Sequence, residues 1–330
     1  MKRVITLPLL FALLTSLSSC DRPAPPISSI EVAAKGIHGA ALSDDGEYSV
    51  IGSIHHGGSF WQHESQERLY NWNHKENELS TIIAADFSHQ GKWVLTANPF
   101  NLVLWETNSG RGERFWTAPG EILDAELGPN GNMALLGLSD HTAVVFNVKR
   151  GGILRTFQHG NRVRSVDLSR DGKLALTGSE DYTAALWDVT SGEKLKTIKH
   201  EDDVQLVKIS PDGNFALSVS KYDKALLWDT LSGKSIGEIP LASERLKRGI
   251  RFTSARFNDD ASLLITGRPD QIIELWDTAT LSIVSRWKAP KRNSWKPTSA
   301  AIVDVGFSKD QQSFWAIASN GFIHRLSLQD

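Results

Sequence analysis

Six of the ten histidines lie within the first 90 residues and raise the question of a metal site. They are His38, His55, His56, His63, His74 and His89. Their spacing matches neither a His-Glu-x-x-His helix nor a Cys/His zinc pattern. We therefore favour ordinary loop and core roles for these side chains over metal ligation.

The other residue types that perform catalysis are equally unorganised. The chain has no Gly-x-Ser-x-Gly elbow, no phosphate-binding glycine loop ending in Lys-Ser/Thr, and no cysteine beyond Cys20. The adjacent carboxylates Asp44-Asp45 and Asp202-Asp203 fall in turn-like segments, where Asp is favoured for local hydrogen bonding. The sequence predicts a protein that is not an enzyme, with no catalytic residue, no cofactor and no metal.

The single cysteine lies at the end of a segment that resembles a secretory signal. Lys2 and Arg3 precede an apolar run over residues 4–17, which is shorter than the ~20 residues needed to span a bilayer. The run ends in Leu17-Ser-Ser-Cys20 and is typical of a secretory signal. This ending resembles the lipobox of bacterial lipoproteins, which implies cleavage after residue 19 and lipidation of Cys20. A signal peptide with a coincidental cysteine is the alternative.

Residues 20–29 contain three prolines in four positions and predict an extended tether beyond the lipidated cysteine. Asp21 directly follows the cysteine. In enterobacterial lipoproteins, an Asp at this position is associated with retention in the inner membrane, so the resemblance implies that the protein stays in the inner membrane rather than moving to the outer one. The expected location is the cell envelope, facing the periplasm. Cleavage would remove Lys2 and Arg3, leaving 34 basic against 38 acidic side chains. This balance gives no reason to expect nucleic acid as a partner.

An internal repeat organises the rest of the chain. Residues 163–188, VRSVDLSRDGKLALTGSEDYTAALWD, align without a gap to residues 204–229, VQLVKISPDGNFALSVSKYDKALLWD, at an offset of 41. Weaker copies end at Trp61, Trp105, Phe146, Trp276 and Leu326. Each copy divides into short apolar segments separated by polar turns, with no helical period, which predicts an all-β chain.

These copies resemble the WD40 repeat, which has a period of about 40–45 residues and a terminal Trp-Asp. Seven copies over residues 37–329 imply one seven-bladed β-propeller, expected to be monomeric, spanning residues 30–330. The last copy lacks an outer strand, and Ile30–Lys35 has the length to supply one. We therefore expect this N-terminal strand to close the ring, which removes free sheet edges.

The resemblance also assigns a structural role to side chains that would otherwise suggest a catalytic triad. WD40 blades are pinned by a tetrad of His, Ser or Thr, Asp and Trp. Two repeats carry the full set: His159, Thr177, Asp181 and Trp187, then His200, Ser218, Asp223 and Trp228. We expect both sets to stabilise their blades.

Two insertions lengthen the spacing between the last copies from 41 to 48 and 50 residues, at 241–250 and 288–297. Both fall between an outer strand and the next inner strand, so both should open on the same rim. They bring cations together with one tryptophan: Arg245, Lys247, Arg248, Arg251, Lys288, Lys291, Arg292, Trp295 and Lys296. Cations beside an aromatic side chain on a rigid scaffold predict a partner-binding surface; a solvated basic loop is the alternative.

The function predicted from these features is a lipid-anchored scaffold that binds other proteins. The rival is an enzyme or small-molecule-binding protein that uses the central channel. A channel pocket with converging carboxylates and histidine would favour the rival, whereas a wide rim patch without such a pocket would favour the scaffold.

Overall fold

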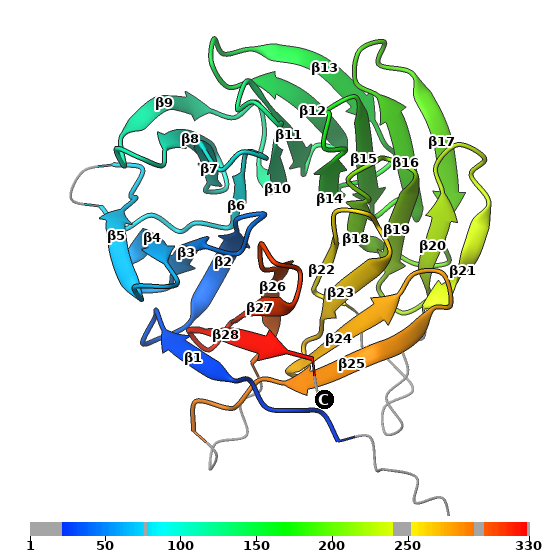
Figure 1. Cartoon of the computed structure of the whole chain (residues 1–330). Helices are drawn as coiled ribbons and strands as arrows, with labels where there is room; N and C mark the ends of the chain where they lie inside the picture. The colour runs from blue at the N-terminus through cyan, green and yellow to red at the C-terminus, as the bar shows by residue number, and fades with distance from the viewer. Residues whose placement is uncertain (1–21, 76–77, 240–251, 294–299, 329–330) are drawn as a thin grey trace, which may run out of the picture.

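The computed structural model describes residues 22–75, 78–239, 252–293 and 300–328. The described residues form 28 strands and no helix, arranged in seven four-stranded antiparallel sheets. Figure 1 shows these sheets as seven blades set in a ring. The prediction of an all-β, seven-bladed propeller is confirmed. No helix in this part of the chain is long and apolar enough to cross a membrane.

The first four blades follow the chain in order. Blade one consists of β2 (Ile37–Leu42), β3 (Tyr48–Ser53), β4 (Gly57–Gln62) and β5 (Glu67–Asn71). Blade two consists of β6 (Ala84–Phe87), β7 (Trp93–Ala97), β8 (Asn101–Glu106) and β9 (Gly112–Thr117). Blade three consists of β10 (Ile122–Leu127), β11 (Met133–Leu138), β12 (Thr142–Asn147) and β13 (Ile153–Gln158). Blade four consists of β14 (Val163–Leu168), β15 (Leu174–Ser179), β16 (Thr183–Asp188) and β17 (Lys194–Lys199).

The remaining blades complete the circle. Blade five consists of β18 (Val204–Ile209), β19 (Phe215–Ser220), β20 (Ala225–Asp229) and β21 (Ser235–Ile239). Blade six consists of β22 (Ser254–Phe257), β23 (Leu263–Gly267), β24 (Ile272–Asp277) and β25 (Ser282–Lys288). Blade seven consists of β26 (Ile302–Phe307), β27 (Ser313–Ala318), β28 (Phe322–Ser327) and, from the other end of the chain, β1 (Ser28–Glu31).

An N-terminal strand closes the ring, although its position differs from the expected one. The strand lies at Ser28–Glu31 instead of residues 30–35, with Ile30 opposite Ile323 of β28. Upstream of it, the Ala24 amide donates to the Arg286 carbonyl at 2.9 Å. Part of the segment expected to be a tether is thus paired with blades six and seven. The reason is that Ala24 and Ile30 are small or apolar enough to be buried there.

The turn between the first and second strands is built the same way in most blades. In blade four, the Ser169 hydroxyl donates to Asp171 at 2.8 Å, and Gly172 adopts a φ of 70°. Glycine has no Cβ to oppose this left-handed conformation. Ala261 and Gln311 hold the same turn position at φ values of 59° and 57°, in the two copies that lack glycine.

The core lies between blades rather than at one centre. Each large cluster of buried apolar side chains takes members from two neighbouring sheets; Val145 of blade three, for example, belongs with Val166 and Trp187 of blade four. Burial on both sheet faces explains why the middle strands are continuously apolar instead of alternating. This packing holds the innermost strands at fixed positions around the central channel.

Candidate functional site

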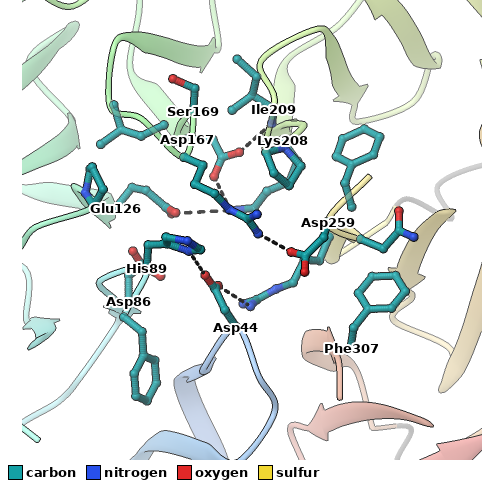
Figure 2. Close-up of a pocket in the computed structure, with 18 of the residues that line it drawn as sticks. Asp44, Asp86, His89, Glu126, Asp167, Ser169, Lys208, Ile209, Asp259 and Phe307 are labelled. Carbon is teal, nitrogen blue, oxygen red and sulfur yellow. Dashed lines mark hydrogen bonds and ion pairs between the residues drawn. The ribbon is translucent and has the colours of Figure 1, made fainter. Parts of the chain in front are cut away.

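The mouth of the central channel is lined by charged side chains from successive innermost strands. One register position, two residues before the first turn of each blade, is occupied by Asp86, Glu126, Asp167, Lys208 and Arg256 in blades two to six. Equivalent positions on equivalent strands face the same side of their blades, so the five side chains converge. They line a cavity of about 140 Å³, which we call the channel mouth (Figure 2).

The cations of the channel mouth are paired with carboxylates. Lys208 Nζ lies 2.7 Å from Asp167 and 3.5 Å from Glu126. Arg256 lies 3.4 Å from Asp44 and 3.5 Å from Asp304. Two further contacts lie at the channel mouth: Arg170 pairs with Asp259, and His89 Nδ1 lies 2.8 Å from Asp44.

Three carboxylates also bind the backbone of the neighbouring blade. The amide of Leu127 donates to Asp86 at 2.8 Å, and that of Ile209 donates to Asp167 at 2.6 Å. Across the ring closure, the amide of Leu42 donates to Asp304 at 2.8 Å. Much of this charge therefore holds adjacent innermost strands together.

Burial changes the protonation of the channel carboxyls. Desolvation raises the pKa of Asp86 to about 7, although the Leu127 amide opposes the shift. Desolvation and the nearby charge of Asp86 raise the pKa of Glu126 well above its usual range. For Lys208, burial acts to lower the pKa, but Asp167 and Glu126 outweigh it and the pKa is raised.

The early histidines are separated in space. His55 and His56 lie in an exposed turn, His63 Nδ1 lies 2.7 Å from the Gly46 carbonyl, and His74 Nε2 lies 2.9 Å from Thr96 Oγ1. Within the described residues, no three His, Cys, Asp or Glu side chains are placed to hold one metal ion.

The blade-four tetrad is fully connected. His159 Nδ1 lies 2.9 Å from Asp181, and His159 Nε2 lies 2.8 Å from Thr177 Oγ1, which also accepts a 2.8 Å hydrogen bond from the indole of Trp187. Burial acts to raise the pKa of Asp181, but hydrogen bonds from His159 and Thr183 outweigh it and lower the pKa. These contacts link the connection before blade four, which contains His159, to the second and third strands of that blade.

The blade-five set is only partly connected. His200 Nε2 lies 2.8 Å from Ser218 Oγ, but His200 Nδ1 is 3.8 Å from Asp223. The buried Trp228 indole nitrogen has no hydrogen-bond partner. Ser218 therefore does not join histidine to tryptophan as Thr177 does.

A third cluster of this kind in blade two was missed from the sequence. Thr96 joins His74 and the indole of Trp105, at 2.9 and 2.8 Å. In the two recognised sets the hydroxyl residue lies 18 positions after the histidine, whereas Thr96 lies 22 positions after His74. An alignment that allowed an insertion before the first strand would have found His74.

The comparison with known families agrees with this geometry. The family model described as WD domain, G-beta repeat matches residues 151–188, which contain the outer strand of blade three and the first three strands of blade four. This WD40 repeat match and the seven-bladed ring together support the WD40 β-propeller family for this chain. No curated protein matches the chain.

The predicted partner-binding residues of the WD40 propeller divide into three groups. Lys288 and Lys291 are exposed. Arg292 instead contacts the protein itself: it lies 2.7 Å from Glu31 and donates to the carbonyls of Ala33 and Asn320. The others lie outside the described residues: Arg245, Lys247, Arg248, Arg251, Trp295 and Lys296.

The structure adds exposed aromatic side chains that sequence reasoning did not single out. Phe100, Tyr182 and Tyr222 lie at turns between second and third strands and are 57%, 49% and 65% exposed. Because strands alternate in direction, these turns share a rim with the connections between blades; we call it the insertion rim. Tyr182 directly follows Asp181 of the tetrad. The alignment of the repeats could therefore have placed Tyr182 in the turn between the second and third strands.

Proposed function

We propose that the WD40 propeller is a lipid-anchored, non-catalytic scaffold whose partner protein binds the insertion rim. The observation that carries the proposal is the exposure of Phe100, Tyr182 and Tyr222 on the rim from which both long insertions leave. Exposed aromatic side chains on rigid turns are the usual anchors of protein interfaces.

The turns that carry these anchors are held by the blades beneath them. The His200 amide donates to the Tyr182 carbonyl at 2.9 Å, and the Lys221 amide donates to the Asp203 carbonyl at 2.9 Å. The first bond ties the blade-four turn to the connection that follows that blade, and the second ties the blade-five turn to the connection that precedes it. A preorganised turn loses little conformational entropy when a partner binds, so more of the contact energy appears as affinity.

The charge of the insertions favours a partner with an acidic face. The two insertions contain seven cations and Trp295, and Arg251 adds an eighth cation directly after the first insertion. Of these cations, Lys288 and Lys291 are exposed in the structure. Exposed charges act mainly on the association rate and are screened by salt. The proposed complex should therefore form more slowly as ionic strength rises.

Affinity capture from detergent-solubilised membranes, followed by mass spectrometry, would identify the partner. With the purified partner, Tyr222→Ala and Trp295→Ala should each raise the dissociation rate by about 30-fold, the effect of losing a ~2 kcal/mol anchor. Lys291→Glu should slow association. Leu231→Ala is the matched control, since Leu231 is 86% exposed at a turn on the opposite rim. Loss of binding in this control, with normal binding in the other variants, would refute the proposed face.

Anchoring through Cys20 forms the second part of the proposal. The lipobox-like Leu17-Ser-Ser-Cys20 supports it, and Asp21 favours the inner membrane with the propeller in the periplasm. Metabolic labelling with a clickable palmitate analogue should mark the wild type and leave Cys20→Ser unlabelled as an uncleaved precursor. Equal labelling of both proteins would contradict the anchoring.

One observation favours the rival function, a small-molecule site in the channel. The channel mouth does combine several carboxylates with His89, and the raised pKa values of Asp86 and Glu126 are of the kind found at functional sites. Calorimetric titration with putrescine, a cationic probe, tests this function. Binding that Glu126→Gln abolishes would support the channel site, and no binding would favour the scaffold alone.

A further inference from the structure

A second cavity lies where the ring closes, on the rim opposite the insertion rim. It measures about 520 Å³, a volume within the range of small-molecule sites. We call it the seam cavity, because blades one and seven and the N-terminal strand all contribute to it. Its lining includes Ile30, His63, Ser313, Trp315 and Arg325.

A single small residue explains why the cavity exists. The first position of each second strand pairs with the residue that follows the repeat tryptophan position, and in six blades it holds a large apolar side chain. These six are Tyr48, Trp93, Met133, Leu174, Phe215 and Leu263. In blade seven the same position holds Ser313, opposite Ser327.

The large side chains normally fill the space beneath the next blade. Trp93 packs under the turn glycine Gly131, and Leu174 packs under Gly213. At the seam, Ser313 is too short to reach the turn of blade one. Trp315, two residues further along the strand, contacts Gly46 instead. The volume that a large residue would occupy at position 313 is left as one part of the cavity.

A second substitution places an unused polar atom at this cavity. In blades two, five and six, the residue after the Trp-Asp position is threonine, whose hydroxyl donates to the carbonyl of the turn residue. These threonines are Thr107, Thr230 and Thr278. His63 takes this position in blade one, and its Nδ1 makes the equivalent bond to the Gly46 carbonyl at 2.7 Å. Nδ1 alone therefore makes the hydrogen bond to the turn carbonyl that threonine makes in the other blades.

The other ring nitrogen, His63 Nε2, is buried and has no hydrogen-bond partner. The residue is 3% exposed and its ring lies 4.5 Å from that of Trp315. Burial lowers the pKa of His63 to about 4, although the Gly46 carbonyl opposes the shift, so the ring is neutral at pH 7. Because a carbonyl only accepts, Nδ1 carries the proton and Nε2 offers a lone pair. An unpaired acceptor of this kind is costly unless a donor reaches it.

The rest of the lining limits the class of ligand. Four carboxylates, from Asp45, Glu47, Glu64 and Asp310, outnumber the two cations of the lining, Lys309 and Arg325, and so disfavour an anion. The guanidinium of Arg325 and the amides of Gln62 and Gln66 supply donors, which a simple cation would leave unused. Trp315 and Ile30 supply apolar surface. Such a mixture matches a neutral molecule that has many hydroxyl groups and C–H faces.

We propose that the seam cavity binds a neutral saccharide, with a sugar hydroxyl donating to His63 Nε2 and a C–H face against Trp315. The lining carboxylates would accept further hydroxyl protons, and Arg325 would donate to ring or hydroxyl oxygens. This activity goes beyond the proposed scaffold function and uses the opposite rim. Because β1 lines the cavity, bound ligand would also stabilise the closed ring.

Saturation-transfer NMR with glucose, N-acetylglucosamine, maltose and chitobiose tests the proposal on the whole mature propeller. At least one of the four should bind. His63→Thr keeps the bond to the Gly46 carbonyl, as in blades two, five and six, but removes Nε2; it should weaken binding about tenfold, the effect of one lost hydrogen bond. Ser313→Leu introduces the residue that blades four and six use, places a larger side chain in the cavity and should abolish binding by steric exclusion.

Leu231→Ala, at an exposed turn of blade five outside the cavity lining, is the matched control and should bind sugar as the wild type does. Melting curves will establish that each variant is folded. Binding that survives Ser313→Leu in a folded protein would overturn the proposal, as would failure of all four sugars to bind the wild type. Neither result touches the partner test, which depends on insertion-rim variants.

Discussion

The imidazole of His324 lies 2.8 Å from the hydroxyl of Ser29, so the last strand of the chain is bound to the first. Their backbones are paired at the same point, with Ser29 opposite His324. His324 is fully buried, and its Nε2 has no hydrogen-bond partner. Closure of the ring therefore depends in part on a buried neutral histidine.

This histidine should make the seam sensitive to acid. Burial lowers the pKa of His324 to about 4, against 6.5 in an unfolded chain. Between these values the unfolded state binds more protons, so the free energy of unfolding falls as pH decreases from 6.5 to 4. The loss at pH 4 is about 3 kcal/mol from this residue. His324→Gln should remove that part of the pH dependence.

Urea denaturation at pH 7 and pH 4.5 measures the effect. The wild type should lose more stability on acidification than His324→Gln does. His63→Thr is a useful comparison, because His63 has a similarly lowered pKa in the same region. Identical pH dependence in wild type and His324→Gln would show that His324 does not control the seam.

The closing strand should contribute through one apolar side chain. Ile30 is 8% exposed and packs with Ile317 and Ile323, whereas Ile27, three residues earlier, is 58% exposed. Ile30→Ala should lower the free energy of unfolding by about 3 kcal/mol, because it leaves a cavity. Ile27→Ala should change it by less than about 0.5 kcal/mol. Equal effects in urea denaturation would contradict the observed register of β1.

The two tetrads should differ in strength because their connections differ. Thr177→Val keeps the side-chain shape but leaves His159 and the indole of Trp187 without their shared partner, at a cost of about 2–3 kcal/mol. Ser218→Ala removes one hydrogen bond, since Trp228 is not joined to it, and should cost about 1 kcal/mol. Thermal unfolding of both variants provides the comparison; an equal loss would mean that the Trp187 bond adds nothing.

Repetition made the fold predictable, and departures from repetition carry the candidate sites. The gapless match between residues 163–188 and 204–229 determined strand order and the positions of Thr177 and Trp187. The channel mouth could not be found this way, because its charges occupy one repeat position with different residues, such as Asp167 and Lys208. Only the ring geometry brings these side chains together.

The seam features escaped prediction for a related reason. Ser313 and His63 are individually unremarkable in sequence, and their effect depends on which residues the other blades place there. The closing strand was predicted from its length and its position before the first inner strand, which cannot distinguish residues 30–35 from the observed Ser28–Glu31. Pairing with β28 selects the register that buries Ile30.

The last prediction concerns Arg292, expected from the sequence to bind a partner. Its guanidinium lies 2.7 Å from Glu31, donates to the Ala33 carbonyl at 2.6 Å and lies over the Phe322 ring. These contacts tie the chain after blade six to the closing strand. Arg292→Ala should therefore lower the free energy of unfolding by about 1–2 kcal/mol, a modest value because Glu31 is half-exposed.

Lys291→Ala is the matched control, since Lys291 is its exposed neighbour, and it should leave stability within about 0.5 kcal/mol of the wild type. A double-mutant cycle with Glu31→Gln isolates the ion pair, because the two substitutions together should cost less than their sum if the pair is formed. Unchanged stability in Arg292→Ala, combined with loss of partner binding, would return Arg292 to the binding surface. Loss of stability with partner affinity retained at low temperature would establish that Arg292 acts on ring closure.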